Sequence, residues 1–231
     1  MYHSLIISGK NTYAEWGLIP TSRPVVNPPE VKTTYVDLPA SHGVLDYTSL
    51  LLGEVPYGQR KGSWEFSALH RSNSLSVYSS LLNYLHGERH TVVLEDEPRF
   101  QYTGRLAVNE WKSDPVFPRV TIDYDLDPFR QSVHASDEND WLWDDLFEGV
   151  IRYGTFTVSG TMYRTFINEG SRAVVPTFTC SSSLTVEYGE NTYTLMAGKN
   201  YNANLSLPPG DSVKVFHGNG SVTVSYREVS L

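Results

Sequence analysis

Two histidines four positions apart are the first residues of this sequence that could do chemistry. On a helix, His86 and His90 would lie on one face, where their imidazoles could bind zinc. Gly87 breaks such a helix, and the run does not have the His-Glu-x-x-His order of a zinc protease. We therefore interpret both histidines as exposed polar side chains at the end of a helix.

Carboxylates form two further groups. Asp123, Asp125 and Asp127 alternate as at the start of a calcium loop, but Pro128 stands where that loop needs a glycine. The three aspartates fit the solvated face of a strand better, and a weak cation site is the alternative. The acids at 95–97 share one tight turn, where two carboxylates are not expected to flank a scissile bond. A hydrolase that uses either group is an alternative, which substitution of Asp123 and Asp125 would test.

The usual patterns of nucleophiles and phosphate loops are incomplete. Ser8-Gly9-Lys10 resembles the end of a phosphate loop, but Ser4 occupies the position of its first glycine. The sequence has no Gly-x-Ser-x-Gly, and Cys180 has neither a basic neighbour nor a nearby histidine that would make it reactive. We therefore expect a protein that is not an enzyme, with no catalytic residue, no cofactor and no metal site.

Aromatic side chains could bind sugars by stacking. Trp141 and Trp143 would place both indoles on one side of an extended segment, and Trp64 and Tyr201 are further candidates. Trp141 and Trp143 are thus a candidate ligand surface, and a lectin-like, carbohydrate-binding module is the alternative function. The competing interpretation is that these aromatic residues pack inside the protein, with the Trp141/Trp143 pair forming a plug between domains.

Composition restricts the class of protein. A net charge of −8 over 231 residues argues against sequence-specific nucleic-acid binding through phosphate contacts. The single Cys180 excludes an internal disulfide and suits assembly in a reducing cytoplasm. The sequence shows neither a signal-peptide pattern nor the run of about 18 apolar residues that a membrane span needs. We expect neither secretion by signal peptide nor a membrane span.

The central element is one amphipathic helix that begins near Ser74 and ends at Gly87. An apolar stripe at helical spacing marks its buried face, and it is formed by Tyr78, Leu81, Leu82 and Leu85. The stripe needs a sheet to cover it, and alternating segments at 63–69, 91–95, 100–111 and 119–126 supply the strands. The sequence predicts one helix among many strands.

Two segments before this helix are suited to reaching a neighbour. Four prolines between Pro20 and Pro29 remove ladder donors and predict an extended arm. The segments 31–38 and 44–48 predict a β-hairpin with a polar tip at Ser41 and His42.

The chain divides into two predicted domains, at 1–130 and 141–231, joined by a polar linker at 131–140. In the second domain, short strands follow one another every 8 to 12 residues, which is typical of a sandwich or jelly roll. Hairpin turns are expected at Gly189-Glu190-Asn191 and Gly218-Asn219-Gly220. The expected fold class is mainly β: a β-sandwich-like domain with one helix and a long hairpin, then a β-sandwich.

Taken together, these segments resemble the distal tail protein family of siphophages and related prophages. The match covers most of the first domain in order: Asn11–Leu18 (NTYAEWGL), Ser22–Val26 (SRPVV), Pro28–Lys32 (PPEVK), Gly43–Thr48 (GVLDYT), Gly62–Phe66 (GSWEF), Tyr84–Gly87 (YLHG) and Tyr102–Leu106 (YTGRL). The resemblance implies a ring-forming domain, six copies of which close a ring at the tip of the tail. The segments that could reach a neighbouring subunit give the candidate interface: Trp16, Arg23, Pro24, Pro28, Ser41 and His42.

The second domain has a looser likeness, to the galectin-like outer domain of many distal tail proteins. Its segments are Arg172–Phe178 (RAVVPTF), Pro208–Asp211 (PPGD) and Gly220–Arg227 (GSVTVSYR), without a galectin sugar-reading cluster. The resemblance implies a homo-oligomer of single or stacked hexameric rings, with a tail tube protein and a tail-tip fibre or lysin protein as partners. The implied location is the tail tip of the virion, after assembly in the host cytoplasm, and the lectin alternative would make the chain a host-recognition module.

Overall fold

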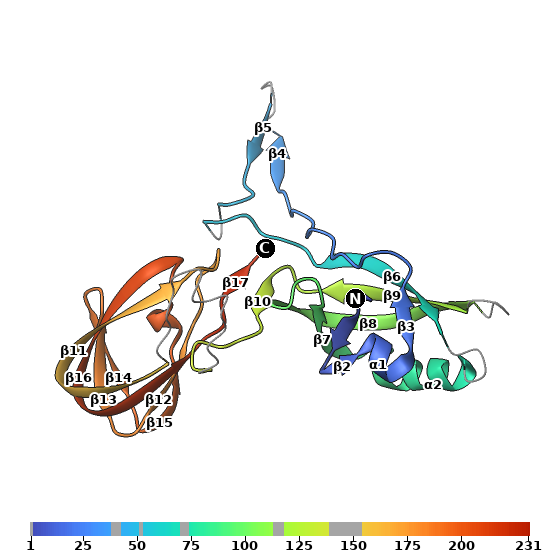
Figure 1. Cartoon of the computed structure of the whole chain (residues 1–231). Helices are drawn as coiled ribbons and strands as arrows, with labels where there is room; N and C mark the ends of the chain where they lie inside the picture. The colour runs from blue at the N-terminus through green and yellow to red at the C-terminus, as the bar shows by residue number, and fades with distance from the viewer. Residues whose placement is uncertain (1, 38–42, 51–52, 70–73, 113–117, 139–153) are drawn as a thin grey trace. The chain divides into compact units, whose positions relative to one another are not determined.

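Apolar side chains gather into two separate cores, one in each of two units. Figure 1 shows the helices and strands of both units. Unit 1 comprises Met1–Arg130 together with Leu231, and unit 2 comprises Gln131–Ser230. The computed structural model describes residues 2–37, 43–50, 53–69, 74–112, 118–138 and 154–231. The predicted mainly β class is confirmed.

Unit 1 is an antiparallel sheet with two helices. Its main strand order is β2-β1-β7-β8-β9-β6-β3, and a separate two-stranded ribbon pairs β4 with β5. Its elements are β1 (Leu5–Ile7), β2 (Lys10–Asn11), α1 (Thr12–Trp16), β3 (Leu18–Pro20), β4 (Tyr35–Asp37), β5 (Val44–Asp46), β6 (Arg60–Ala68), α2 (Ser74–Leu85), β7 (Arg89–Leu94), β8 (Phe100–Lys112) and β9 (Arg119–Leu126), followed by β10 (Arg130–Ser132).

The short helix α1 was not expected and shapes the sheet. Asn11 caps its start by accepting hydrogen bonds from Tyr13 N and Ala14 N, and Gly17 ends it at φ 63°. Five residues of helix span only about 7.5 Å. Because α1 links β2 to β3, which are the two edges of the strand order, the sheet must curl until its edges are close. The prediction of a single helix was therefore wrong.

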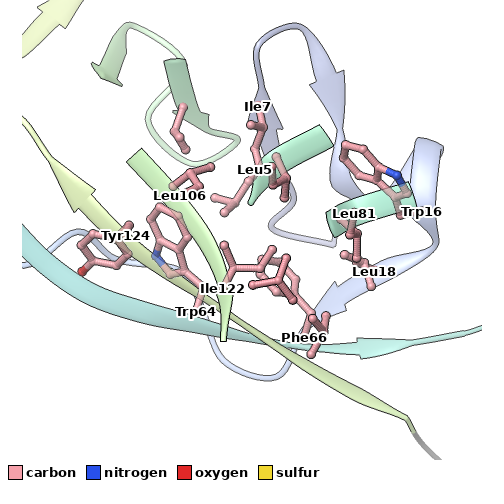
Figure 2. Packing of buried hydrophobic residues seen from close by; sticks show 14 of the residues in the cluster. Leu5, Ile7, Trp16, Leu18, Trp64, Phe66, Leu81, Leu106, Ile122 and Tyr124 are labelled. Atoms are coloured by element: carbon pink, nitrogen blue, oxygen red, sulfur yellow. The ribbon is translucent and has the colours of Figure 1, made fainter. Parts of the chain in front are cut away.

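The helix α2 packs its predicted stripe on the inside of this curled sheet. Leu81 and Leu85 are completely buried, and Tyr78 and Leu82 pack beside them at the edge of the core. Figure 2 shows Leu81 among large side chains from several strands, including Leu5, Ile7, Phe66, Leu106 and Ile122. Past the end of α2, Gly87 has φ 80°, as a terminating glycine requires. The predicted helix and its buried face are confirmed.

Alternation along the central strands matches the sequence. In β9 the buried residues are Val120, Ile122, Tyr124 and Leu126. The neighbouring strand β8 contributes Gly104, which pairs with Leu126. A side chain at that glycine would begin 2.3 Å from the backbone oxygen of Asp125, so the close approach of the two strands requires glycine there.

Unit 2 is an all-β fold around its own aromatic core, and most of its elements form one six-stranded antiparallel sheet. The strand order is β14-β13-β16-β12-β15, and β11 pairs with β16. Its elements are β11 (Thr155–Asn168), β12 (Thr177–Cys180), β13 (Leu184–Tyr188), β14 (Asn191–Leu195), β15 (Gly198–Tyr201), the 3-10 helix η1 (Ala203–Leu205), β16 (Gly210–Ser225) and β17 (Val229–Ser230).

The strands β11 and β16 pair without interruption over fourteen positions, from Thr155↔Thr223 to Asn168↔Gly210. The turn predicted at Gly218-Asn219-Gly220 is therefore wrong, because these residues lie inside β16. Gly160 and Gly218 pair with each other and have φ 73° and 122°. Two facing glycines let both strands change direction while their ladder continues. The turn predicted at 189–191 is confirmed, because Tyr188 pairs with Asn191 around it.

The first part of the predicted linker is folded onto unit 2. Ser136 is buried, its hydroxyl donates to the Val224 carbonyl at 2.9 Å, and its backbone N–H donates to the Tyr226 carbonyl. Gly154 follows the segment 139–153 and packs closely against Asp137. A Cβ added to Gly154 would lie 2.3 Å from the Cα of Asp137. Residues 131–138 are thus part of the fold of unit 2.

Candidate assembly surface

The ribbon of β4 and β5 carries exposed apolar side chains on both faces. Val36 and Leu45 pair across the ribbon and are 45% and 40% exposed. On the other face, Tyr35 and Val44 are 56% and 52% exposed. A two-stranded hairpin with no covered face is only marginally stable in water, and clustered exposed apolar groups mark interaction sites. This ribbon is the strongest candidate for a protein contact in unit 1.

The base of the hairpin is tied to a neighbouring segment by backbone hydrogen bonds. Lys32 N donates to the Pro56 carbonyl at 3.0 Å, and Gly58 N donates to the Glu30 carbonyl at 2.7 Å. Val31 and Tyr57 form an isolated antiparallel bridge. The ribbon therefore starts from a fixed base, which lowers the entropy cost of binding through it. The predicted hairpin is confirmed, and its predicted tip, with Ser41 and His42, lies outside the described residues.

The proline-rich arm lies along the sheet of its own unit. Thr21 N donates to the Glu65 carbonyl at 2.9 Å, and Trp64 Nε1 donates to the Val25 carbonyl at 2.9 Å. Asn27 N donates to the Tyr124 hydroxyl, and the buried Arg60 donates to the Asn27 carbonyl. These backbone groups of the arm thus form hydrogen bonds within their own subunit.

The predicted interface residues of the arm differ in their exposure. Trp16 is 5% exposed and packs in the core, where its Nε1 donates to the Ser80 hydroxyl at 3.2 Å. Pro24 is also buried, because the arm is docked at that point. Arg23 and Pro28 are exposed. The side chains of Trp16 and Pro24 thus serve the subunit's own packing.

Arg23 has a fixed position because it pairs with a carboxylate. Its Nε lies 2.8 Å from Asp96 Oδ2, and His3 Nδ1 lies 2.9 Å from both oxygens of the same group. The hydrogen bond from His3, followed by the contact with Arg23, holds the pKa of Asp96 below its ordinary value. The arm, the chain start and the β7–β8 turn meet at this carboxylate.

The groups that could do chemistry have structural roles. His90 is buried and sits between the Ser8 hydroxyl at 3.0 Å and the Tyr84 carbonyl at 2.9 Å, whereas His86 is exposed. The prediction that both histidines are exposed at a helix end is therefore wrong for His90, which is buried in β7. Burial raises the pKa of the Cys180 thiol, which makes it a poor nucleophile. Among the described residues, no group of three or more His, Cys, Asp or Glu could hold a metal ion.

Asp123 and Asp125 lie on the polar face of β9, and Asp127 directly follows the strand. Asp125 pairs in register with Arg105 and Lys61 on the two neighbouring strands, and Asp127 forms an ion pair with Arg89. Cross-strand pairs of opposite charge stabilise a sheet by a few tenths of a kcal/mol to about 1 kcal/mol. This arrangement is that of a solvated strand face, as the alternation predicted.

The residues considered for sugar stacking are distributed unequally. Trp64 is 4% exposed and is closed to a ligand, whereas Tyr201 is 72% exposed. Trp141 and Trp143 lie outside the described residues. No helix in the described parts of the chain has the length and apolar character to cross a membrane.

These features define the class: a two-unit, mainly antiparallel β protein whose unit 1 carries an exposed apolar hairpin. No family model matches the chain, and no curated protein matches its sequence. Among solved structures it is similar to the crystal structure of SPP1 Dit (gp 19.1), described as a paradigm of the hub adsorption apparatus in phages that infect Gram-positive bacteria. The TM-score is 0.65 at 12% identity, over 98% of this chain and 99% of that one. The likeness to distal tail proteins expected from the sequence is confirmed at the level of the fold.

Proposed function

We propose that this chain is a structural subunit of a bacteriophage tail tip, a distal tail protein that acts as a hub between the tail tube and the tail-tip or host-adsorption proteins. The observation that carries the proposal is the likeness to SPP1 Dit, which extends over both units and nearly the full length of both chains. A likeness over both units supports a shared architecture more strongly than a match to one common β-domain.

In this proposal the subunits form a hexameric ring in the virion. A ring of identical subunits needs a heterologous interface, in which one surface of each subunit fits a different surface of the next. The hairpin supplies the first surface through four exposed side chains, Tyr35, Val36, Val44 and Leu45. Arg23 and Pro28 of the arm are exposed as well and contribute further contacts in this proposal. Burying four such side chains is worth several kcal/mol per interface.

The first test is the mass of the full-length protein in solution, measured by light scattering over a range of concentration and salt. The proposal predicts particles of six times the 26.0 kDa chain mass, with a central hole in negative-stain images. Co-expression with a tail tube protein and a tail-tip protein should produce the ring if the chain alone stays monomeric. A chain that remains monomeric in both experiments would contradict the ring.

The second test addresses the hairpin. Deletion of Pro39 to Gly43, or the double substitution Val36→Ser with Leu45→Ser, should weaken ring closure while circular dichroism and thermal unfolding stay unchanged. The matched control is Val213→Ser, because Val213 is 53% exposed on unit 2. Rings that survive both hairpin variants would place the interface elsewhere.

A further inference from the structure

Unit 2 has an open groove that none of the assembly contacts uses. Its volume is about 620 Å³, and all of its lining residues belong to unit 2. Its walls come from the 131–138 segment, from the 173–175 segment before β12, from Tyr201 at the end of β15 and from the end of β16. Two of its apolar lining residues, Val174 and Tyr226, are 7% and 8% exposed. The groove therefore offers a ligand little apolar side-chain surface at these two positions.

One aromatic ring is available in this groove. Tyr201 is 72% exposed although it lines the groove, whereas Tyr226 beside it is buried and donates its hydroxyl to the Ile167 carbonyl at 2.6 Å. An exposed tyrosine presents a flat apolar face together with a polar edge. Such a face suits a ligand that is itself flat, with C–H groups on its faces and hydroxyls around its rim, and a sugar ring has this shape.

The polar side chains among the lining residues are held in place. Arg227 donates to the carbonyls of Ser132 and Val133 and pairs with Glu138 Oε1 at 2.9 Å. Asp137 accepts a hydrogen bond from the Ser225 hydroxyl at 2.7 Å through Oδ1. Within the described part of the chain, Asp137 Oδ2 has no such partner and can accept from a ligand hydroxyl. A carboxylate that is already held in this way loses little further conformational entropy when it accepts a hydrogen bond from a ligand.

The charge of the groove narrows the ligand class. Among the lining residues, Asp137 and Glu138 contribute two negative charges and Arg227 contributes one positive charge. Both oxygens of Glu138 are engaged, Oε1 by Arg227 and Oε2 by His134 at 3.1 Å. A polyanion with repeated phosphates would be repelled by this excess, whereas a neutral chain of sugars would not. We propose that this groove binds a neutral polysaccharide, with one sugar ring stacked on Tyr201 and a sugar hydroxyl bonded to Asp137 Oδ2. The proposal does not depend on ring formation, so either can fail alone.

The test uses the full-length protein and an array of neutral oligosaccharides of glucose, galactose, rhamnose and N-acetylglucosamine, followed by calorimetric titration of the glycan that binds best. Tyr201→Ala should weaken binding about tenfold, the effect of losing about 1.4 kcal/mol of stacking and area. The matched control is Tyr163→Ala, because Tyr163 is also 72% exposed but lies on β11 outside the groove. The control should bind as the unaltered protein does.

A second variant tests the polar side of the groove. Asp137→Asn keeps an acceptor for Ser225 but removes the charge, and it should weaken binding severalfold while unfolding stays unchanged. The proposal is overturned if no neutral glycan on the array binds, if Tyr163→Ala and Tyr201→Ala weaken binding equally, or if neither does. Binding of poly(glycerol phosphate) or of a peptide library instead of neutral glycans would also overturn it.

Discussion

The ammonium group of Lys214 lies 3.3 Å from the centre of the Tyr188 ring, inside unit 2. The lysine side chain is completely buried, and its Nζ also donates to the Ser206 carbonyl at 3.3 Å. Burial lowers the pKa of Lys214 from 10.5 to about 8. The ring and one carbonyl therefore stabilise a buried charge that water would otherwise solvate.

Replacing this lysine by methionine should stabilise unit 2 at neutral pH. Below about pH 8 the folded and unfolded states both hold the proton, so the folded state bears the full cost of burying the charge. The lowered pKa corresponds to a cost of about 3 kcal/mol, partly offset by a cation–π contact of about 1 kcal/mol. Lys214→Met should therefore raise the free energy of unfolding by about 1–3 kcal/mol in denaturant titrations at pH 7.

The gain from this substitution should depend on pH in one direction. Between about pH 8 and 10.5 the unfolded chain binds a proton that the folded chain releases, so the stability of the natural protein rises with pH. The advantage of Lys214→Met should accordingly shrink at pH 9.5. Lys199→Met, at an exposed lysine of the same unit, is the control and should change little. An equal gain at both pH values would contradict the assigned cost.

The strands that bury one face could be predicted from the sequence, because the alternation of apolar and polar residues determines which face is buried. Trp64 and Phe66 on β6 and Ile122 on β9 are buried as their alternation predicts, because a shift of one residue would expose the whole set. The helix α1 escaped prediction because five residues are too few to show a period. Its signal was present in the flanking Asn11 and Gly17, which are cap residues.

The parts that escaped prediction depend on contacts between distant segments. Gly218-Asn219-Gly220 has the chemistry of a turn, but its pairing with β11 keeps it in a strand. The apolar hairpin reads as two half-buried strands, and only the structure shows that both of its faces are open. The sequence signal for two apolar faces was the presence of adjacent apolar residues, such as Val44 and Leu45, because neighbouring residues of a strand point to opposite faces. The groove could not be predicted, because its walls come from four separate segments.

Gly104 should be intolerant of even a methyl group. A Cβ there would lie 2.3 Å from the Asp125 carbonyl oxygen and 2.5 Å from the Leu126 Cα, which are both backbone atoms of the paired strand. Gly104→Ala should therefore destabilise unit 1 by about 3 kcal/mol or more, measured by thermal unfolding. Gly58→Ala is the control, because its nearest contact would be an ordinary 3.5 Å. A loss of similar size in both variants would show that the strand spacing is not the cause.

The proline-rich arm should loosen when one hydroxyl is removed from the sheet beneath it. Tyr124 accepts a hydrogen bond from Asn27 N at 3.0 Å, and burial raises the pKa of its hydroxyl. Tyr124→Phe removes this acceptor at a cost of about 1 kcal/mol. Hydrogen exchange at Asn27 and limited proteolysis between 21 and 30 should both become faster. Tyr102→Phe is the control, because its hydroxyl bonds to Glu97 at 3.4 Å, outside the arm. Equal acceleration in both variants would contradict this anchoring role.

The carboxylate of Asp96 should titrate below its ordinary range because it has two partners, His3 and Arg23. The hydrogen bond from His3 is the largest single cause of the lowered pKa, and Arg23 adds a hydrogen bond and a positive charge. NMR titration should therefore show the pKa of Asp96 rising in both His3→Ala and Arg23→Ala. Since the folded-state pKa is lowered, the stabilisation is present above the unfolded value of 3.8 and is lost as the pH falls through the lower value. His86→Ala, at an exposed histidine elsewhere in unit 1, is the control. A pKa of Asp96 that stays lowered in both His3→Ala and Arg23→Ala would contradict the assignment of these two partners.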